Sequence, residues 1–107
     1  MKKHRQTTFT DIPQAVKKKV WERDEHRCVL CRRTRCCAPN AHFVARSQGG
    51  LGIEENIVTL CLYCHDLYDQ SAERDAIREE LREYLQSKYP DWNEQKLYYH
   101  KYYKREG

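Results

Sequence analysis

Apolar residues recur at helical spacing near the start of the chain. Ile12, Val16 and Val20 lie four positions apart, which predicts an amphipathic helix over about residues 10–23. The residues before it, 1–9, are mostly polar and basic and show no such period. We expect them to form a flexible basic arm.

Two short apolar runs in the middle of the chain predict strands. The first covers residues 41–45 and the second residues 56–60, and the glycine-rich segment 48–52 between them predicts a flexible loop. Beyond the second run, apolar residues at helical period predict helices over residues 62–88 and 91–105. The tyrosines of the last segment either pack on the preceding helix or, with the interleaved lysines, contact unpaired bases.

This order of elements predicts a small α+β protein, with two strands and a helix at its centre and further helices at both ends. We expect residues 10–107 to form a single domain with a helical extension over residues 70–105. The 107 residues are 39% hydrophobic and 34% charged, and the mean hydropathy is −1.03. Such a chain has little apolar mass for a core, so we expect a metal or disulfide bonds to stabilise it.

Six cysteines offer that stabilisation, and four of them form two CxxC pairs, Cys28 with Cys31 and Cys61 with Cys64. Tetrahedral Zn²⁺ takes four soft ligands, and two CxxC pairs supply them at the usual spacing. The 29 residues between Cys31 and Cys61 are too many for a compact zinc ribbon, so they must form a structured excursion. The sequence therefore predicts a structural zinc site.

Cys36 and Cys37 leave two alternatives open. Either residue could replace a ligand of the zinc site, or both could be loop thiols. We favour loop thiols, because adjacent cysteines cannot readily bind one ion in the geometry of a CxxC turn.

The compartment bears on the choice between metal and disulfide bonds. No apolar signal segment follows the basic N-terminus, and no apolar run approaches the length of a membrane span. We therefore expect a cytoplasmic protein with no membrane partner. Thiols stay reduced there, which favours a metal site.

The formal net charge is only +4, but the charges are unevenly distributed. Basic residues cluster, for example at Lys17 and Lys18, whereas acidic residues concentrate in the segment 66–83. Clustered cations suit a polyanion such as nucleic acid, although a solvated helix face gives the same pattern.

The spacing of several motifs resembles the zinc-stabilised branch of the HNH nuclease family. The matching elements are the first CxxC pair, His42, the turn Arg46-Ser47-x-Gly49-Gly50, Asn56, and Leu60-Cys61-x-x-Cys64-His65. The resemblance covers about residues 20–69 and implies a ββα-metal core, also called the His-Me finger. Proteins that look like this often occur in phage genomes or mobile elements.

The resemblance implies a metal-dependent DNA endonuclease that hydrolyses phosphodiester bonds. His42 would be the general base, and a neutral imidazole is also chemically suited to activate water. Asn56 would orient this base or its loop by hydrogen bonding. His65 would ligate a catalytic divalent cation, such as Mg²⁺, Mn²⁺, Ni²⁺ or Zn²⁺, at the phosphate and the leaving oxygen. We expect four residues to bind the nucleic acid: Arg46, Ser47, Lys17 and Lys18.

One position departs from the family pattern. In much of the family, the residue before the base also ligates the catalytic cation, but here it is Ala41, whose methyl group cannot bind a metal. Asp69 lies four residues after His65, hence on the same face of a helix, and its carboxylate could complete the site.

Each candidate residue also has a simpler structural interpretation. His42 could be a packed strand histidine, His65 a hydrogen-bonded neighbour of the zinc site, and Asn56 a turn cap. The chain could accordingly be a zinc-stabilised nucleic-acid-binding module without cleavage activity, or a protein-interaction module. We favour the endonuclease because all three residues stand at family spacing.

Overall fold

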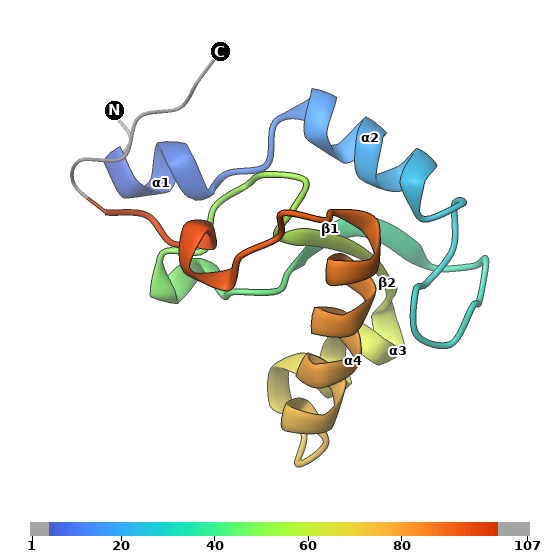
Figure 1. The fold of residues 1–107 in the computed structure, drawn as a ribbon. Helices are drawn as coiled ribbons and strands as arrows, with labels where there is room; N and C mark the ends of the chain where they lie inside the picture. Colours follow the sequence, from blue (N-terminus) through green and yellow to red (C-terminus); the bar gives the residue numbers. More distant parts are fainter. Residues whose placement is uncertain (1–4, 101–107) are drawn as a thin grey trace.

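The computed structural model describes residues 5–100 and has an α+β fold built around two antiparallel strands (Figure 1). The elements in chain order are α1 (Arg5–Thr10), α2 (Gln14–Arg23), β1 (Cys37–His42), the 3₁₀ helix η1 (Arg46–Gln48), β2 (Ile57–Cys61), α3 (Leu62–Gln70), α4 (Arg74–Lys88) and the 3₁₀ helix η2 (Glu94–Leu97). The predicted α+β class is confirmed. No helix among residues 5–100 is long and apolar enough to cross a membrane.

The two strands pair with a one-residue bulge in β1. Cys37 lies opposite Cys61, whereas His42 lies opposite Ile57, so β1 contains one residue more than β2 between these pairs. The irregularity falls between Ala38 and Ala41 and includes Pro39, which has no amide hydrogen to donate to a ladder. All five residues of β2 are buried.

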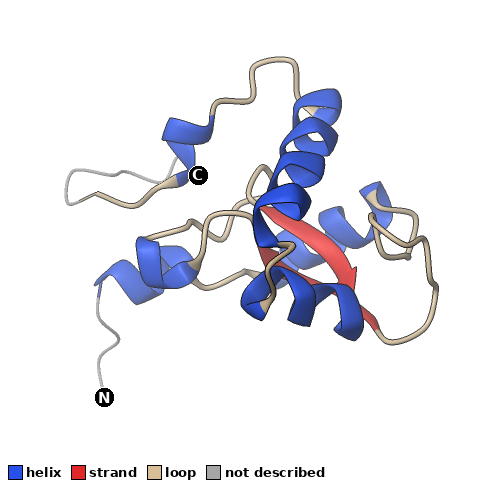
Figure 2. Cartoon of the chain, turned by 90° about the horizontal axis from the view of Figure 1, so that it is seen from below, coloured by secondary structure: helices blue, strands red, loops and turns tan. Residues whose placement is uncertain are grey.

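Helices cover the sheet and enclose one apolar cluster. Helix α2 packs on both strands and α3 packs on β2, and the strands pass between helices in Figure 2. Helix α4 turns Ile77, Leu81 and Leu85 inward at the spacing of one helix face, as its sequence period predicts. The buried cluster also contains Phe43 and Leu97.

The first strand lies earlier than predicted. Residues 37–40 lie before the predicted strand 41–45 but belong to β1, whereas residues 43–45 of that predicted strand do not. The strand ends at His42 because the Val44 amide donates to the Asn56 side chain at 2.8 Å instead of to a β-ladder. The second strand lies within one residue of its predicted position.

The predicted helix 62–88 is two helices. Ser71 interrupts it, because the Ser71 hydroxyl donates to the Leu67 carbonyl at 2.6 Å and accepts from the Glu73 amide at 3.1 Å. A serine side chain that takes over these backbone groups competes with helix continuation.

The two ends also differ from their predictions. Helix α1 begins at Arg5, within the segment 1–9 that was expected to be an arm. Between residues 91 and 100 only η2 forms in place of the predicted helix, because the chain pairs in an extended form with the glycine loop. The Leu51 amide donates to the Leu97 carbonyl at 2.8 Å, and the Tyr99 amide donates to the Gly49 carbonyl at 2.6 Å. Residues 1–4 and 101–107 lie outside the described part.

An arginine at the end of α2 joins three parts of the chain. The Arg23 guanidinium donates to the Glu54 and Ile57 carbonyls at 2.8 and 2.7 Å, and to the Tyr89 hydroxyl at 3.0 Å. Burial alone would lower the pKa of Arg23, but the hydrogen bond and charge of Asp24 raise it above its ordinary value. The guanidinium therefore stays charged inside the fold.

The partner carboxylate is buried as well. Asp24 accepts from Arg23 Nε at 2.7 Å and from the Thr59 amide at 2.8 Å, and the Tyr84 hydroxyl also donates to it. The pair thus links α2 to β2 and α4 by charge-assisted hydrogen bonds.

We expect Asp24→Ala to lower the free energy of unfolding by about 3–5 kcal/mol, because it leaves the Arg23 guanidinium buried without its carboxylate. Thermal unfolding at saturating zinc measures the change. Glu22→Ala, which removes an exposed carboxylate from the same helix, should change stability by less than about 0.5 kcal/mol. Equal losses in the two variants would contradict the buried-pair interpretation.

Candidate metal centre and active site

Four cysteine sulfurs converge at one end of the sheet. The Sγ atoms of Cys28, Cys31, Cys61 and Cys64 all lie within 4.8 Å of one another, and those of Cys31 and Cys61 are 3.7 Å apart. A tetrahedral Zn²⁺ with Zn–S bonds of about 2.3 Å separates its sulfurs by about 3.8 Å. The four thiols can therefore hold a metal ion such as zinc, as the CxxC spacing predicts.

Two local turns present these sulfurs. After Cys28, the Arg32 amide donates back to the Cys28 carbonyl at 3.0 Å, and Arg32 itself has a φ of 67°. Cys61 is the N-cap of α3, where its sulfur accepts from the Cys64 amide at 3.4 Å. A helix N-terminus favours a negatively charged thiolate, and thiolates are the metal-binding form.

The thiols do not ionise equally in the absence of a cation. Burial opposes ionisation of Cys28, but backbone hydrogen bonds from Cys31, Cys61 and Leu30 lower its pKa to about 7. Burial raises the pKa of Cys64 well above its ordinary value, as do its contacts with Cys61 and Cys28. The Cys28 thiolate forms readily, whereas ionisation of Cys64 requires a nearby positive charge, which a divalent metal supplies.

Cys36 and Cys37 stand outside the four-sulfur group. Cys36 is exposed, and the Cys37 thiol donates to the Arg33 and Arg35 carbonyls at 3.0 and 3.2 Å. Neither residue joins the four-sulfur group, as expected, but Cys37 is the first residue of β1 and not a loop thiol.

We expect the chain to bind one Zn²⁺, and Cys64→Ser to lose it, because a hydroxyl is a poor substitute for a thiolate ligand. Cys36→Ser and Cys37→Ser should retain the metal. Elemental analysis of the purified variants measures the stoichiometry, and thermal unfolding with and without a chelator measures the coupling to stability. Loss of zinc from either control variant would mean that the ligand set is different.

A second group of polar residues surrounds His42. An open hollow of about 450 Å³ lies at the end of β1, lined by Asp11, Ile12, Lys17, Asn40, His42 and Arg46. Of the expected nucleic-acid contacts, Lys17 and Arg46 line it, Ser47 is exposed beside Arg46, and Lys18 lies outside it.

A backbone carbonyl fixes the tautomer of His42. The ring atom Nε2 lies 2.9 Å from the Thr10 carbonyl oxygen, which can only accept a hydrogen bond. The proton of the neutral ring therefore sits on Nε2, and Nδ1 carries the lone pair.

The surroundings also keep His42 neutral. Burial lowers the pKa of this half-buried imidazole, and the charges of Arg46 and His65 lower it further. The hydrogen bond to Thr10 and the charge of Asp11 act in the opposite direction but do not reverse the shift. A neutral imidazole with an available lone pair is the form in which histidine accepts a proton.

No motif or spacing in the sequence predicts Asp11 in this hollow. Its carboxylate pairs with the Arg46 guanidinium, so it partly neutralises a cation expected to contact phosphate. The contact joins residues 35 positions apart. No local pattern could have predicted it.

Asn56 is fully buried and holds the loop that follows His42. Besides accepting from the Val44 amide, its side chain donates to the Val44 and Leu51 carbonyls at 3.2 and 2.8 Å. The Phe43 amide donates to the Asn56 carbonyl at 2.7 Å. Its position therefore suits the expected loop-orienting role, and its side-chain bonds go to the loop backbone.

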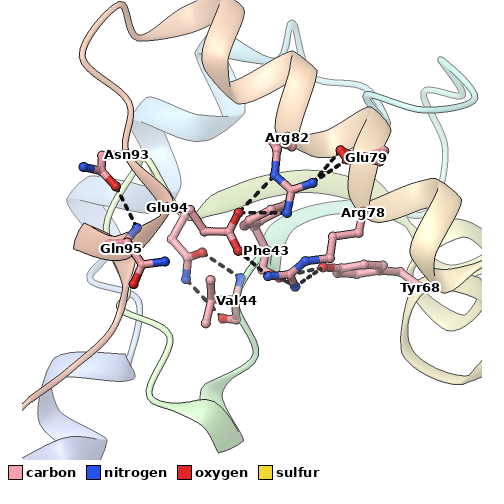
Figure 3. A network of polar contacts seen from close by, with 10 residues as sticks. Phe43, Val44, Tyr68, Arg78, Glu79, Arg82, Asn93, Glu94 and Gln95 are labelled. Carbon is pink, nitrogen blue, oxygen red and sulfur yellow. Dashed lines mark hydrogen bonds and ion pairs between the residues drawn. The ribbon is translucent and has the colours of Figure 1, made fainter.

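The residue next to His42 is fixed from the other side by α3 and α4. The Tyr68 hydroxyl donates to the Phe43 carbonyl at 2.6 Å, and the Arg78 guanidinium lies over the Phe43 ring, 4.6 Å from its centroid. Glu94 accepts from Arg78 at 2.7 Å and from Arg82 at 3.0 Å, which ties the C-terminal segment to α4 (Figure 3). These contacts hold the backbone next to His42.

His65 and Asp69 form a pair on α3, with His65 Nε2 3.7 Å from Asp69 Oδ2. Two donors of one tetrahedral cation at bonds of about 2.1 Å lie about 3.4 Å apart, so the pair fits a shared ion. Neither residue lines the hollow of His42. In the described part of the chain, only the four cysteines form a group of three or more metal-binding side chains.

Ala41 is completely buried, so its position offers no ligand or space for one.

Comparisons with protein-family models, curated proteins and solved structures find no match for this chain. Its chemistry is therefore inferred from the site itself.

We expect NMR titration to place the pKa of His42 below the ordinary 6.5 of a histidine. Arg46→Gln should raise this pKa, because it removes a positive charge that disfavours the imidazolium and leaves Asp11 without that partner. The matched variant Arg35→Gln, which removes an exposed cation outside the hollow, should not shift it. An unchanged pKa in Arg46→Gln would contradict the electrostatic role of Arg46.

Proposed function

We propose that this chain is a metal-dependent DNA endonuclease of HNH type, with a ββα-metal core formed by β1, β2 and α3. The observation that carries the proposal is the state of His42. Its Nε2 is committed to the Thr10 carbonyl, its pKa is lowered by burial, and it lines an open hollow beside two cations. A packed structural histidine would not need an open, positively charged surrounding.

The residues of the hollow have complementary tasks in phosphodiester hydrolysis. Nδ1 of His42 takes the proton from the attacking water, because Nε2 is already occupied as a donor. Lys17 and Arg46 stabilise the charge that develops on the phosphate, and the Asn40 amide can donate a hydrogen bond to the same group. Asn56 keeps the following loop in place through its bonds to Val44.

His65 and Asp69 are the residues that would hold the catalytic cation. A bound divalent cation supplies Lewis-acid stabilisation of the phosphate and of the leaving oxygen. With only two protein ligands, most coordination positions stay open to water and phosphate. We therefore expect weak cation affinity, so that nicking requires a high concentration of the added divalent cation.

A second candidate is a zinc-stabilised nucleic-acid-binding module without cleavage activity. The buried methyl group of Ala41 favours it, because the family's usual ligand position is closed. Under this alternative the hollow binds a phosphate and releases it unchanged.

Nicking of supercoiled plasmid across a series of divalent cations distinguishes the two. We expect cation-dependent nicking that His42→Ala reduces by a factor of about 10²–10⁴ at matched zinc content, since that is the usual contribution of a general base. His100→Ala, which removes a histidine outside the hollow, should retain the activity. Nicking that survives His42→Ala would remove His42 as the base, and no nicking with intact DNA binding would establish the second candidate.

A further inference from the structure

Helix α2 carries a stripe of side chains that are exposed or half-buried. Four residues at positions i, i+3, i+4 and i+7 lie on one face: Gln14, Lys17, Lys18 and Trp21. Val20, beside this face, is the buried residue of the helix. In residues 5–100, neither Lys17 nor Lys18 has an ion-pair partner.

This stripe lines a second hollow of about 450 Å³, whose other wall is Cys37 and Pro39 of β1. Trp21 lies outside the apolar core cluster and stacks on His26, with ring centroids 5.0 Å apart and planes at 7°. A tryptophan that lines a hollow between lysines is not explained by core packing.

The second hollow adjoins the hollow of His42, because Lys17 lines both of them. The bulge of β1 lies at this junction: Pro39 in it lines the second hollow, and the next residue, Asn40, lines the hollow of His42. One surface therefore leads from Trp21 past Lys17 to the candidate base.

We propose that this surface binds an unpaired segment of DNA, with one base stacked on Trp21 and its flanking phosphates at Lys17 and Lys18. The proposal rests on the proposed function, since it makes single-stranded or flapped DNA the preferred substrate of the same site. A flat aromatic ring binds the face of a base, and in a duplex these faces are covered by neighbouring bases. The two cations match the charge of the backbone on both sides of that base.

Binding is tested separately from cleavage, using the full zinc-loaded chain with His42→Ala. Fluorescence anisotropy compares four labelled oligonucleotides of equal length: a thymidine strand, the same strand with abasic sites, a duplex, and a duplex with a single-stranded flap. We expect the thymidine strand and the flap to bind more tightly than the duplex. The abasic strand should bind about five- to a hundredfold more weakly than the thymidine strand, as the loss of stacking predicts.

Two variants separate the base contact from the phosphate contact. Trp21→Leu should weaken binding of the thymidine strand to the level of the abasic strand and leave abasic binding unchanged. Lys17→Gln should weaken both strands and reduce the slope of log affinity against log salt by about 0.7. Lys96→Gln, the same change of charge on η2 outside both hollows, is the matched control.

The proposal would be overturned if the His42→Ala chain without further changes bound the thymidine and abasic strands equally, or bound the duplex more tightly. This comparison needs no variant of Trp21, so it remains decisive if that variant fails to fold. Strand binding with the expected pattern but no nicking by the wild-type chain would retain the surface and reject the endonuclease. Nicking of duplex plasmid without any preference for single strands would support the endonuclease and reject the proposed surface for unpaired DNA.

Discussion

The convergence of four sulfurs within 4.8 Å is the constraint on which the rest of the fold depends. It joins the turn after α2 to the junction of β2 and α3, and the chain between these two points has to leave and return. That excursion contains β1, the glycine loop and β2 up to Leu60, and therefore His42, Arg46 and Asn56. Closing such a loop costs conformational entropy, and metal binding offsets this cost in chains with small cores. The metal centre thus determines where the residues of the hollow can lie, although it takes no part in their chemistry.

Networks of charged groups add stability that the small apolar core does not provide. The Arg23–Asp24 pair fastens α2 to β2, and Glu94 between two arginines fastens the C-terminal segment to α4. Both networks lie beside backbone that supports the candidate site, the first at the start of β2 and the second at Phe43. A chain of low mean hydropathy can in this way hold the loop after His42 rigidly, provided that each buried charge has its partner.

Sequence patterns predicted the elements whose cause is local. The CxxC turns, the buried face of α4 and the position of β2 follow from the spacing of a few residues, and the structure has them where expected. The C-terminal ends of β1 and of helix α3 depend on single side chains, Asn56 and Ser71. Each forms hydrogen bonds with backbone groups, which the periodicity of the sequence does not reveal. The link between Thr10 and His42 was invisible for a different reason: it uses a backbone carbonyl 32 residues away.

The order of the ligands along the chain has a consequence for protein synthesis. Cys28 and Cys31 leave the ribosome well before Cys61 and Cys64, so a growing chain holds half of a metal site until its second half emerges. Leu97 and Glu94, which close the core and fasten α4, emerge later still. His42 is therefore translated before the segments that complete its surroundings. A nascent chain that has not yet reached Leu97 has no assembled hollow around this histidine.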